Sequence, residues 1–84
     1  METHTPAPWH VEDHLLDDDP RLTIESRERS IAKIQLPDER DTANALLIAA
    51  APDLLAALMN IVKNGFSREA EAQAVAAIAR AEGR

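Results

Sequence analysis

A proline in the middle of an otherwise helical stretch limits how this chain can fold. The stretch runs from Ala43 to Val62 and reads ANALLIAAAPDLLAALMNIV, with Pro52 at its centre. A proline inside a helix removes a hydrogen bond and clashes with the preceding turn, at about 3 kcal/mol, but it costs almost nothing in a first turn. We therefore expect two consecutive helices, roughly 40–50 and 52–63, with a bend at Ala51-Pro52. One kinked helix is the alternative.

Flanking residues predict where the helices begin and end. Asp38 and Asp41 are N-cap candidates for the first helix, and Asn64-Gly65 predicts a left-handed cap after the second. Ser67 is the N-cap candidate of a last helix, from Arg68 to Ala81.

Apolar spacing predicts which helical residues pack inward. For the first two helices, a single stripe is expected at residues 43, 46, 47, 50, 54, 58, 61 and 62. The face of the last helix is narrow, and its residues are Ala70, Ala74, Val75, Ile78 and Ala81. Because this face is mostly alanine, it buries little area but allows a neighbouring helix to approach closely.

The first half of the chain alternates apolar and polar residues, as half-buried strands do. Strand-like segments occur at 9–15, 22–26 and 31–36, separated by the DDDP loop at 17–20 and a charged turn at 27–30. The predicted fold class is α+β, a small antiparallel β-sheet of two or three strands followed by two or three helices. Residues 1–84 are expected to form one domain, with an extended arm at 1–8, strands within 9–36 and helices within 38–82.

The apolar residues provide only a small core. They make up 45% of the 84 residues, but sixteen of them are alanine. The remaining large side chains barely offset the entropy lost on ordering, and small scaffolds in that position often add a partner. The chain has no cysteine, which excludes disulfides and thiolate metal sites. We therefore expect self-association, as a homodimer.

The net charge of −6 is concentrated in one segment. Residues 1–20 contain six acidic residues and no Lys or Arg, whereas residues 21–84 contain nine of each sign. Direct binding to nucleic acid is not expected, because it requires a basic surface. An acidic segment favours a basic protein surface instead. The predicted partner-binding residues here are Glu12, Asp13, Asp17, Asp18 and Asp19.

No feature of the sequence indicates a membrane or a targeting segment. Asn44, Asp53 and Asn60 interrupt the best candidate for a membrane span. The N-terminus, METHTPAPW, lacks the basic and then apolar regions of a signal peptide. We expect a protein without a membrane partner that acts in the cytoplasm of a host cell.

Few residues could support chemistry. His10, Glu12 and His14 would share one face of a strand and could form a metal shelf, but no further ligand follows at suggestive spacing. Asp17–Asp19 lacks the alternating ligands and glycine of a calcium loop. Only two glycines occur, so no glycine-rich phosphate loop is present. We expect a solvated strand face, a solvated or docking acidic loop, no cofactor, no metal and no enzymatic activity.

Two segments resemble small proteins encoded by phages and prophages. Those proteins carry an N-terminal HTPGPW signature and a later segment like ANARLIAAAPELLEAL. This chain has HTPAPW at 4–9 and ANALLIAAAPDLLAAL at 43–58, together about a quarter of its length. It departs from the pattern at Ala7, where glycine is usual, and at Leu46, where arginine is usual. Leu46 is either a gained interface residue or part of the core here.

The resemblance implies a phage-borne context and carries over no catalytic residues. Small acidic phage proteins without an enzyme signature include many inhibitors of host defence, of which anti-CRISPR proteins are the best-known class. The resemblance thus implies a non-enzymatic interaction protein. It would bind a host protein or nucleoprotein complex with a basic surface, such as a Cas effector, and block its nucleic-acid binding or assembly. The alternative is a self-associating phage accessory or structural protein with no defence target.

Overall fold

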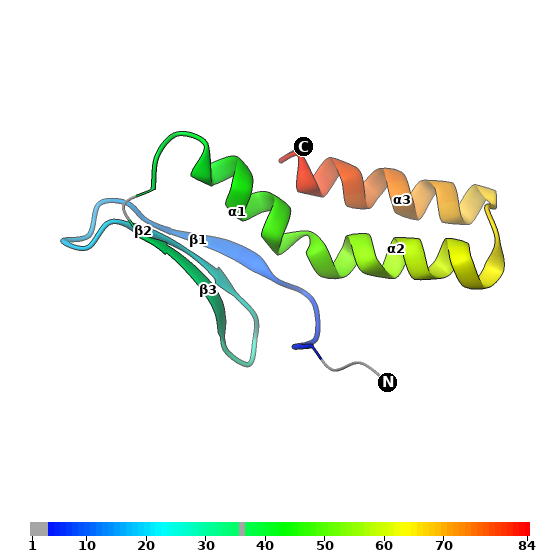
Figure 1. The fold of residues 1–84 in the computed structure, drawn as a ribbon, viewed down its shortest axis with the longest axis horizontal. Coiled ribbons are helices and arrows are strands. Elements are labelled where there is room, and N and C mark those ends of the chain that lie inside the picture. Colours follow the sequence, from blue (N-terminus) through cyan, green and yellow to red (C-terminus); the bar gives the residue numbers. More distant parts are fainter. Residues whose placement is uncertain (1–3, 36) are drawn as a thin grey trace.

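The computed structural model describes residues 4–35 and 37–84, and it places a sheet before a set of helices (Figure 1). The sheet is antiparallel and contains β1 (His10–His14), β2 (Arg21–Glu25) and β3 (Ser30–Gln35), in that order. The helices are α1 (Asp41–Ala49), α2 (Ala51–Asn64) and α3 (Arg68–Ala81). The predicted α+β class is therefore confirmed. Residues 1–3 of the expected arm and Leu36 of the expected third strand lie outside the described residues.

The molecule is elongated because only part of the helical half covers the sheet. Helix α1 lies over one face of the sheet, while α2 and α3 run antiparallel to each other and extend away from it (Figure 1). The principal extents are 48 × 26 × 14 Å, and the radius of gyration is 14.5 Å. A compact chain of this length would have a radius of gyration of about 12 Å. Much of the helical hairpin thus has no other layer packed on it.

The core lies between the central strand and α1. Leu22 and Ile24 on β2 are the largest fully buried side chains, and Ala45 and Ala49 of α1 pack against them. The register pairs Leu22 with Ile34 and Ile24 with Val11, so apolar side chains of all three strands share this face. Trp9, just before β1, also packs against the cluster. Such a core is small, as expected from the alanine-rich sequence.

The proline separates α1 from α2, but the break comes one residue earlier than predicted. Helix α1 ends at Ala49, Ala50 takes φ −85° and ψ −6°, and α2 already begins at Ala51. The two helices are bent by 47°. Pro52 lies in the first turn of α2, where backbone N–H groups have no acceptor within the helix. Ala51 can therefore stay helical, and the bend falls on Ala50 rather than on Ala51-Pro52.

One of the predicted N-caps is confirmed, and the pair proposed for α1 is wrong. The Ser67 hydroxyl accepts a hydrogen bond from Ala70 N at 3.1 Å and caps α3. Helix α1 instead has Arg40 at its N-cap, without a side-chain cap hydrogen bond. Asp38 accepts from Arg40 N at 2.8 Å, and Asp41 accepts from Asp38 N at 2.9 Å. The two carboxylates thus stabilise the turn before α1 rather than capping the helix.

The predicted left-handed cap after α2 is also only partly correct. Gly65 has a positive φ of 81°, but its ψ of 173° places it outside the left-handed helical region. Its N–H donates to Ile61 O at 2.8 Å, which closes the last turn of α2. The chain then leaves in an extended direction toward Ser67. Asn64 is the last residue of α2 itself.

The apolar positions expected to form one packed stripe are divided by the bend. On α2, Ala57 is buried, whereas Leu58 and Val62 are 62% and 87% exposed. On α3, Ala70 and Ala77 are buried, whereas Val75 and Ile78 are exposed. The hairpin closes mainly through alanines, and the stripe predicted for α1 and α2 is only partly correct. Positions 46, 50, 54 and 61 are buried or half-buried, whereas 43, 47, 58 and 62 are exposed.

The length and apolar composition of the helices bear on whether one of them could span a membrane. Within residues 4–35 and 37–84, no single helix is long and apolar enough to cross one. Among the described helices, α1 and α2 taken together reach that length and composition, across their 47° bend.

Candidate functional site

The predicted acidic residues gather at the end of the sheet that lies farthest from the helical hairpin (Figure 1). We call residues 13–19, at the junction of β1 and β2, the acidic tip. It contains Asp13, Asp17, Asp18 and Asp19, all exposed. Because the tip turns between two antiparallel strands, the four carboxylates are confined to one small region. The structure thus brings together four of the six predicted partner-binding residues.

Hydrogen bonds connect the residues of the acidic tip to one another and to β2. Asp13 Oδ1 accepts from Leu15 N at 2.8 Å. Arg21 Nη1 donates to Asp19 O at 3.0 Å and to Asp17 Oδ2 at 3.4 Å. These contacts leave carboxylate lone pairs free for a partner, and Asp18 bonds to no residue that the structure describes. The tip is therefore hydrogen-bonded to its neighbours and open to solvent.

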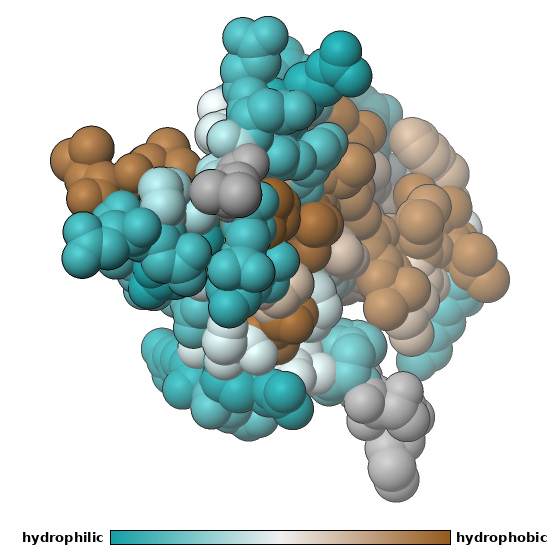
Figure 2. Space-filling model, turned by 60° about the vertical axis from the view of Figure 1, so that its left-hand side comes forward, coloured by the Kyte–Doolittle hydropathy of each residue, from teal (hydrophilic) through white to brown (hydrophobic). Residues whose placement is uncertain are grey.

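Two leucines project from the acidic tip, a feature that sequence reasoning did not single out. Leu16 is fully exposed, at 102%, and Leu15 is 40% exposed. Together with Asp13, His14 and Asp17, they line a surface hollow. Figure 2 shows hydrophobic atoms projecting from a hydrophilic surround at the end that is turned toward the viewer. The signal in the sequence was the pair Leu15-Leu16 directly before Asp17–Asp19. Two adjacent large apolar residues are uncommon in a solvent-exposed loop.

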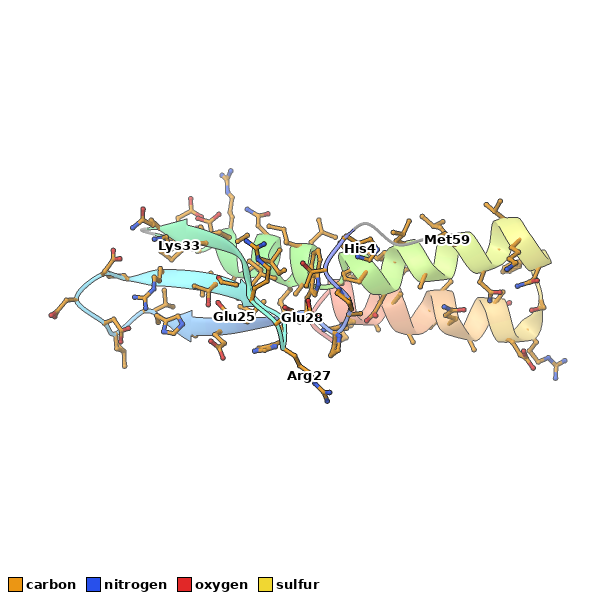
Figure 3. The ribbon with its side chains drawn as sticks, turned by 90° about the horizontal axis from the view of Figure 1, so that it is seen from below. His4, Glu25, Arg27, Glu28, Lys33 and Met59 are labelled. Atoms are coloured by element: carbon orange, nitrogen blue, oxygen red, sulfur yellow. The ribbon has the colours of Figure 1, made fainter. Side chains whose placement is uncertain are left out.

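Glu12, the fifth predicted acidic residue, lies on β1 beside the two histidines. His10 Nε2 is 3.3 Å from Glu12 Oε1, and His14 Nε2 is 3.8 Å from Glu12 Oε2. The three side chains share the face of the sheet that points away from α1, as expected for a strand. Figure 3 looks onto this polar face. Among the described residues, no group of three or more His, Cys, Asp and Glu side chains is arranged to hold a metal ion.

Thr23, His14 and Asp17 lie in the order of a catalytic triad, but their geometry does not support that role. Thr23 Oγ1 is 3.4 Å from His14 Nε2, and His14 Nδ1 is 3.6 Å from Asp17 Oδ2. Nucleophile, base and orienting group normally lie about 2.6–3.2 Å apart. Thr23 is also only 7% exposed, in the middle strand of a sheet. We assign these contacts to holding the tip against β2.

Leu46, the remaining predicted partner-binding residue, does not join the acidic tip. It is half-buried in α1, and its Cδ1 lies 3.0 Å from where a side-chain carbon on Gly83 would be. The leucine thus packs beside the C-terminal end of α3. The neighbouring Leu47 is the more exposed of the two, at 54%.

A second exposed surface runs along α2. Its members are spaced i, i+3, i+4 and i+7, which places them on one side of the helix. This outer stripe consists of Leu55, Leu58, Met59 and Val62, with exposed fractions of 43, 62, 57 and 87%. Figure 3 shows Met59 on the side of α2 that faces away from α3. The stripe predicted from the sequence contained Leu58 and Val62 but not Leu55 or Met59. It assumed one apolar stripe on α2, whereas the helix has a buried one and an exposed one.

Polar contacts mark the opposite side of the hairpin. Asn60 Nδ2 donates to Gln73 Oε1 at 2.8 Å, and Arg80 donates to Asp53. Asp53, Gln73 and Arg80 line a groove whose floor is alanine. The two sides of the hairpin therefore differ in chemistry. One side carries polar residues that hydrogen-bond to one another, and the other carries the exposed apolar side chains of the outer stripe.

Comparison with known proteins supports the phage-borne context that was expected from the sequence. The family described as Salmonella phage P22 protein Y8K6 matches residues 1–84, the whole chain. Neither the curated proteins nor the solved structures provide a match. The chain belongs to the family of Salmonella phage P22 protein Y8K6 and is a small phage-encoded protein.

Proposed function

We propose that this protein is a non-enzymatic inhibitor of a host defence system, of the anti-CRISPR type. It would act in the host cytoplasm by docking its acidic tip on a basic surface of a nucleoprotein complex, such as a Cas effector. Nucleic-acid binding or assembly of that complex would then be blocked. The observation that carries the proposal is the acidic tip itself, in which a fully exposed Leu16 lies beside four exposed carboxylates.

The distribution of charge supports this choice of partner. The net charge of −6 arises entirely within residues 1–20, so the field of the molecule is strongest around the tip. Surfaces that bind nucleic acid are rich in Lys and Arg, and an acidic protein competes for them through the same electrostatic attraction. Direct binding of the protein to nucleic acid is disfavoured by the same charge.

The leucines add a contact that charge alone does not provide. Rim charges mainly speed association and set orientation, whereas desolvated apolar anchors dominate binding energy. Leu15 and Leu16 lie in the middle of the acidic tip, so a partner would contact them together with the carboxylates. The preferred partner surface therefore has a small apolar depression surrounded by basic side chains.

Competition for DNA binding tests this proposal directly. A purified Cas surveillance complex of the phage's host is incubated with labelled target DNA and increasing amounts of the protein, and DNA binding is measured by mobility shift. The wild type should displace DNA, and added salt should weaken the effect. The triple variant Asp17→Asn/Asp18→Asn/Asp19→Asn should be about tenfold weaker, since each exposed ion pair contributes roughly 0.2–1 kcal/mol.

A variant with the same change in net charge provides the control. Glu28→Gln/Glu39→Gln/Glu71→Gln removes three exposed carboxylates outside the tip and should inhibit as strongly as the wild type. Equal weakening of both triple variants would mean that overall charge, not the tip, is responsible. If the wild type neither binds a surveillance complex of its host nor displaces DNA from one, the proposed anti-CRISPR role is excluded.

A second candidate function is a self-associating phage accessory or structural protein with no defence target. The outer stripe of α2 favours it, because four large apolar side chains remain exposed there. The two candidates differ in what the tip does. An accessory protein should keep its self-association after the triple change in Asp17, Asp18 and Asp19, whereas a defence inhibitor should inhibit about tenfold more weakly.

A further inference from the structure

The chain exposes much more surface than a monomer of its size should. Its accessible surface is 6217 Å² for a mass of 9.2 kDa. Folded monomers of this mass expose about 4,900 Å², so the excess is about 1,300 Å². A standard protein interface buries about 800 Å² on each partner, and homodimer interfaces often bury more. The excess is therefore as large as the surface that one subunit contributes to a stable dimer.

Exposed apolar side chains are concentrated on the helical half. Leu55, Leu58, Met59 and Val62 form the outer stripe of α2, and Leu47 and Ile48 of α1 are exposed just before the bend. Figure 2 shows a broad hydrophobic region on the helical side of the molecule. None of these six residues is charged. A patch of this kind on a soluble domain marks an interaction surface.

The outer stripe is complementary to itself. If two α2 helices pack antiparallel about a two-fold axis that passes between Leu58 and Met59, Leu58 of each chain faces Met59 of the other. Leu55 then faces Val62 of the other chain. The stripe contains the alternating three- and four-residue spacing of a short coiled-coil seam, at 55, 58 and 62 and again at 55, 59 and 62, in which such side chains interdigitate. This reciprocity is what a two-fold symmetric interface requires.

The distribution of charge favours association through the helical half rather than through the half that carries the acidic tip. Residues 51–84 contain four acidic and four basic residues and are neutral as a group. The acidic tip lies at the other end of a molecule 48 Å long (Figure 1). Two chains that meet through α2 therefore keep their acidic ends apart. At 0.15 M ionic strength the screening length is about 8 Å, so repulsion between the tips would be small.

We infer that the outer stripe of α2 is the interface of a symmetric homodimer, in which a second copy of this chain covers Leu55, Leu58, Met59 and Val62. The dimer is a four-helix arrangement made from two α2–α3 hairpins, and it presents its two acidic tips at opposite ends. This interface is compatible with both functions proposed above and depends on neither. A lipid surface is the less suitable occupant, because α2 carries only one basic residue, Lys63, and the chain is acidic.

Mass measurement with one substitution and a matched control tests the interface. Light scattering coupled to size exclusion, at about 100 μM chain, should give twice 9.2 kDa for the wild type. Leu58→Glu should raise the dimer dissociation constant roughly 100-fold or more, because it buries a carboxylate at the centre of the seam. Leu16→Glu makes the same exchange at the acidic tip and should leave the mass unchanged. Because Leu58 is 62% exposed in the monomer, helix content by circular dichroism should be equal in all three proteins.

Disulfide cross-linking is a second test of the interface, and it does not require the introduction of a charged residue. The chain has no cysteine, so a single introduced cysteine can form a disulfide only between two chains. Met59→Cys, next to the proposed axis, should cross-link readily under mild oxidation, whereas Leu16→Cys should not. A monomeric wild type at 100 μM would overturn the inference, whether or not it binds lipid vesicles. A dimer that persists in Leu58→Glu and is not linked by Met59→Cys would also overturn it. Neither outcome bears on the competition assay at the tip.

Discussion

Arg80, near the end of α3, donates a hydrogen bond to the backbone carbonyl of Trp9, just before β1. The other terminal nitrogen of the same guanidinium donates to Asp53 in the first turn of α2. One side chain thus joins the start of the sheet to both helices of the hairpin, across 71 residues of sequence. This connection matters because, among the described residues, the largest buried side chains lie between the sheet and α1 rather than in the hairpin.

Removal of this side chain should loosen the hairpin from the sheet. We expect Arg80→Ala to lower the free energy of unfolding by about 1–2 kcal/mol, since both acceptors lose a charge-assisted donor at a partly exposed site. Arg80→Lys should recover only part of the loss, because an ammonium group cannot reproduce the planar fork. Urea unfolding followed by the fluorescence of Trp9, the only tryptophan, measures both changes.

Arg27 offers a matched control for this prediction. It is exposed in the β2–β3 turn and projects away from the sheet (Figure 3). Arg27→Ala removes the same charge and should leave the urea midpoint within experimental error. An equal shift for Arg27→Ala and Arg80→Ala would show that net charge, and not the connection to Trp9 and Asp53, determines the effect.

The N-cap of α3 should contribute measurably to stability. Ser67 accepts from Ala70 N and satisfies one of the free amides at the start of the helix. Ser67→Ala should cost about 1 kcal/mol, and Ser67→Asp should restore the cap. Thermal unfolding by circular dichroism checks this order of stabilities. Equal midpoints for Ser67→Ala and Ser67→Asp would contradict it.

Gly65 should resist substitution even by asparagine. Its φ of 81° and ψ of 173° lie in a region that only glycine occupies readily, and a side-chain carbon there would meet no other atom within 4 Å. Gly65→Ala should therefore cost about 1–3 kcal/mol through backbone strain alone. Asparagine tolerates the left-handed helical region but not this one, so Gly65→Asn should be no better. Recovery of stability in Gly65→Asn would indicate a left-handed cap instead.

The elements were predictable because local chemistry determines them. The alternation at Leu22 and Ile24 fixed a strand, Ser67 fixed the start of α3, and Pro52 fixed a break between two helices. What local chemistry did not determine was the position of the break. Whether Ala51 stays helical before a proline depends on the first-turn hydrogen bonds of α2, where Leu54 N donates to Ala50 O.

The candidate surfaces were less predictable than the fold. The exposed acids of the tip follow from sequence, since Asp17–Asp19 precede a proline in a loop. The exposure of Leu58 and the burial of Ala57 do not, because both are apolar and lie side by side in the chain. Which of the two apolar stripes on α2 is buried depends on the helix that packs against it. That helix is α3, and it packs against the alanine side of α2.

Asp41 should make stability depend on pH in the acid range. The backbone N–H of Asp38 and the side-chain amide of Asn44 both donate to its carboxylate, and these bonds hold the pKa of Asp41 below its ordinary value. The folded state thus binds the proton less readily than the unfolded state. The resulting stability is fully present above the unfolded pKa and is lost as the pH falls through the lower pKa of the folded state.

Substitution of this carboxylate should flatten the acid limb of the stability curve. In Asp41→Asn, the fall in unfolding free energy on acidification should be shallower than in the wild type, because one linked proton is removed. Asp18→Asn is the control, since the Asp18 carboxylate accepts no hydrogen bond from the described residues, and its slope should match the wild type. Urea unfolding at a series of pH values measures all three slopes. If Asp41→Asn retained the wild-type slope, its bonds to Asp38 and Asn44 would not be linked to folding.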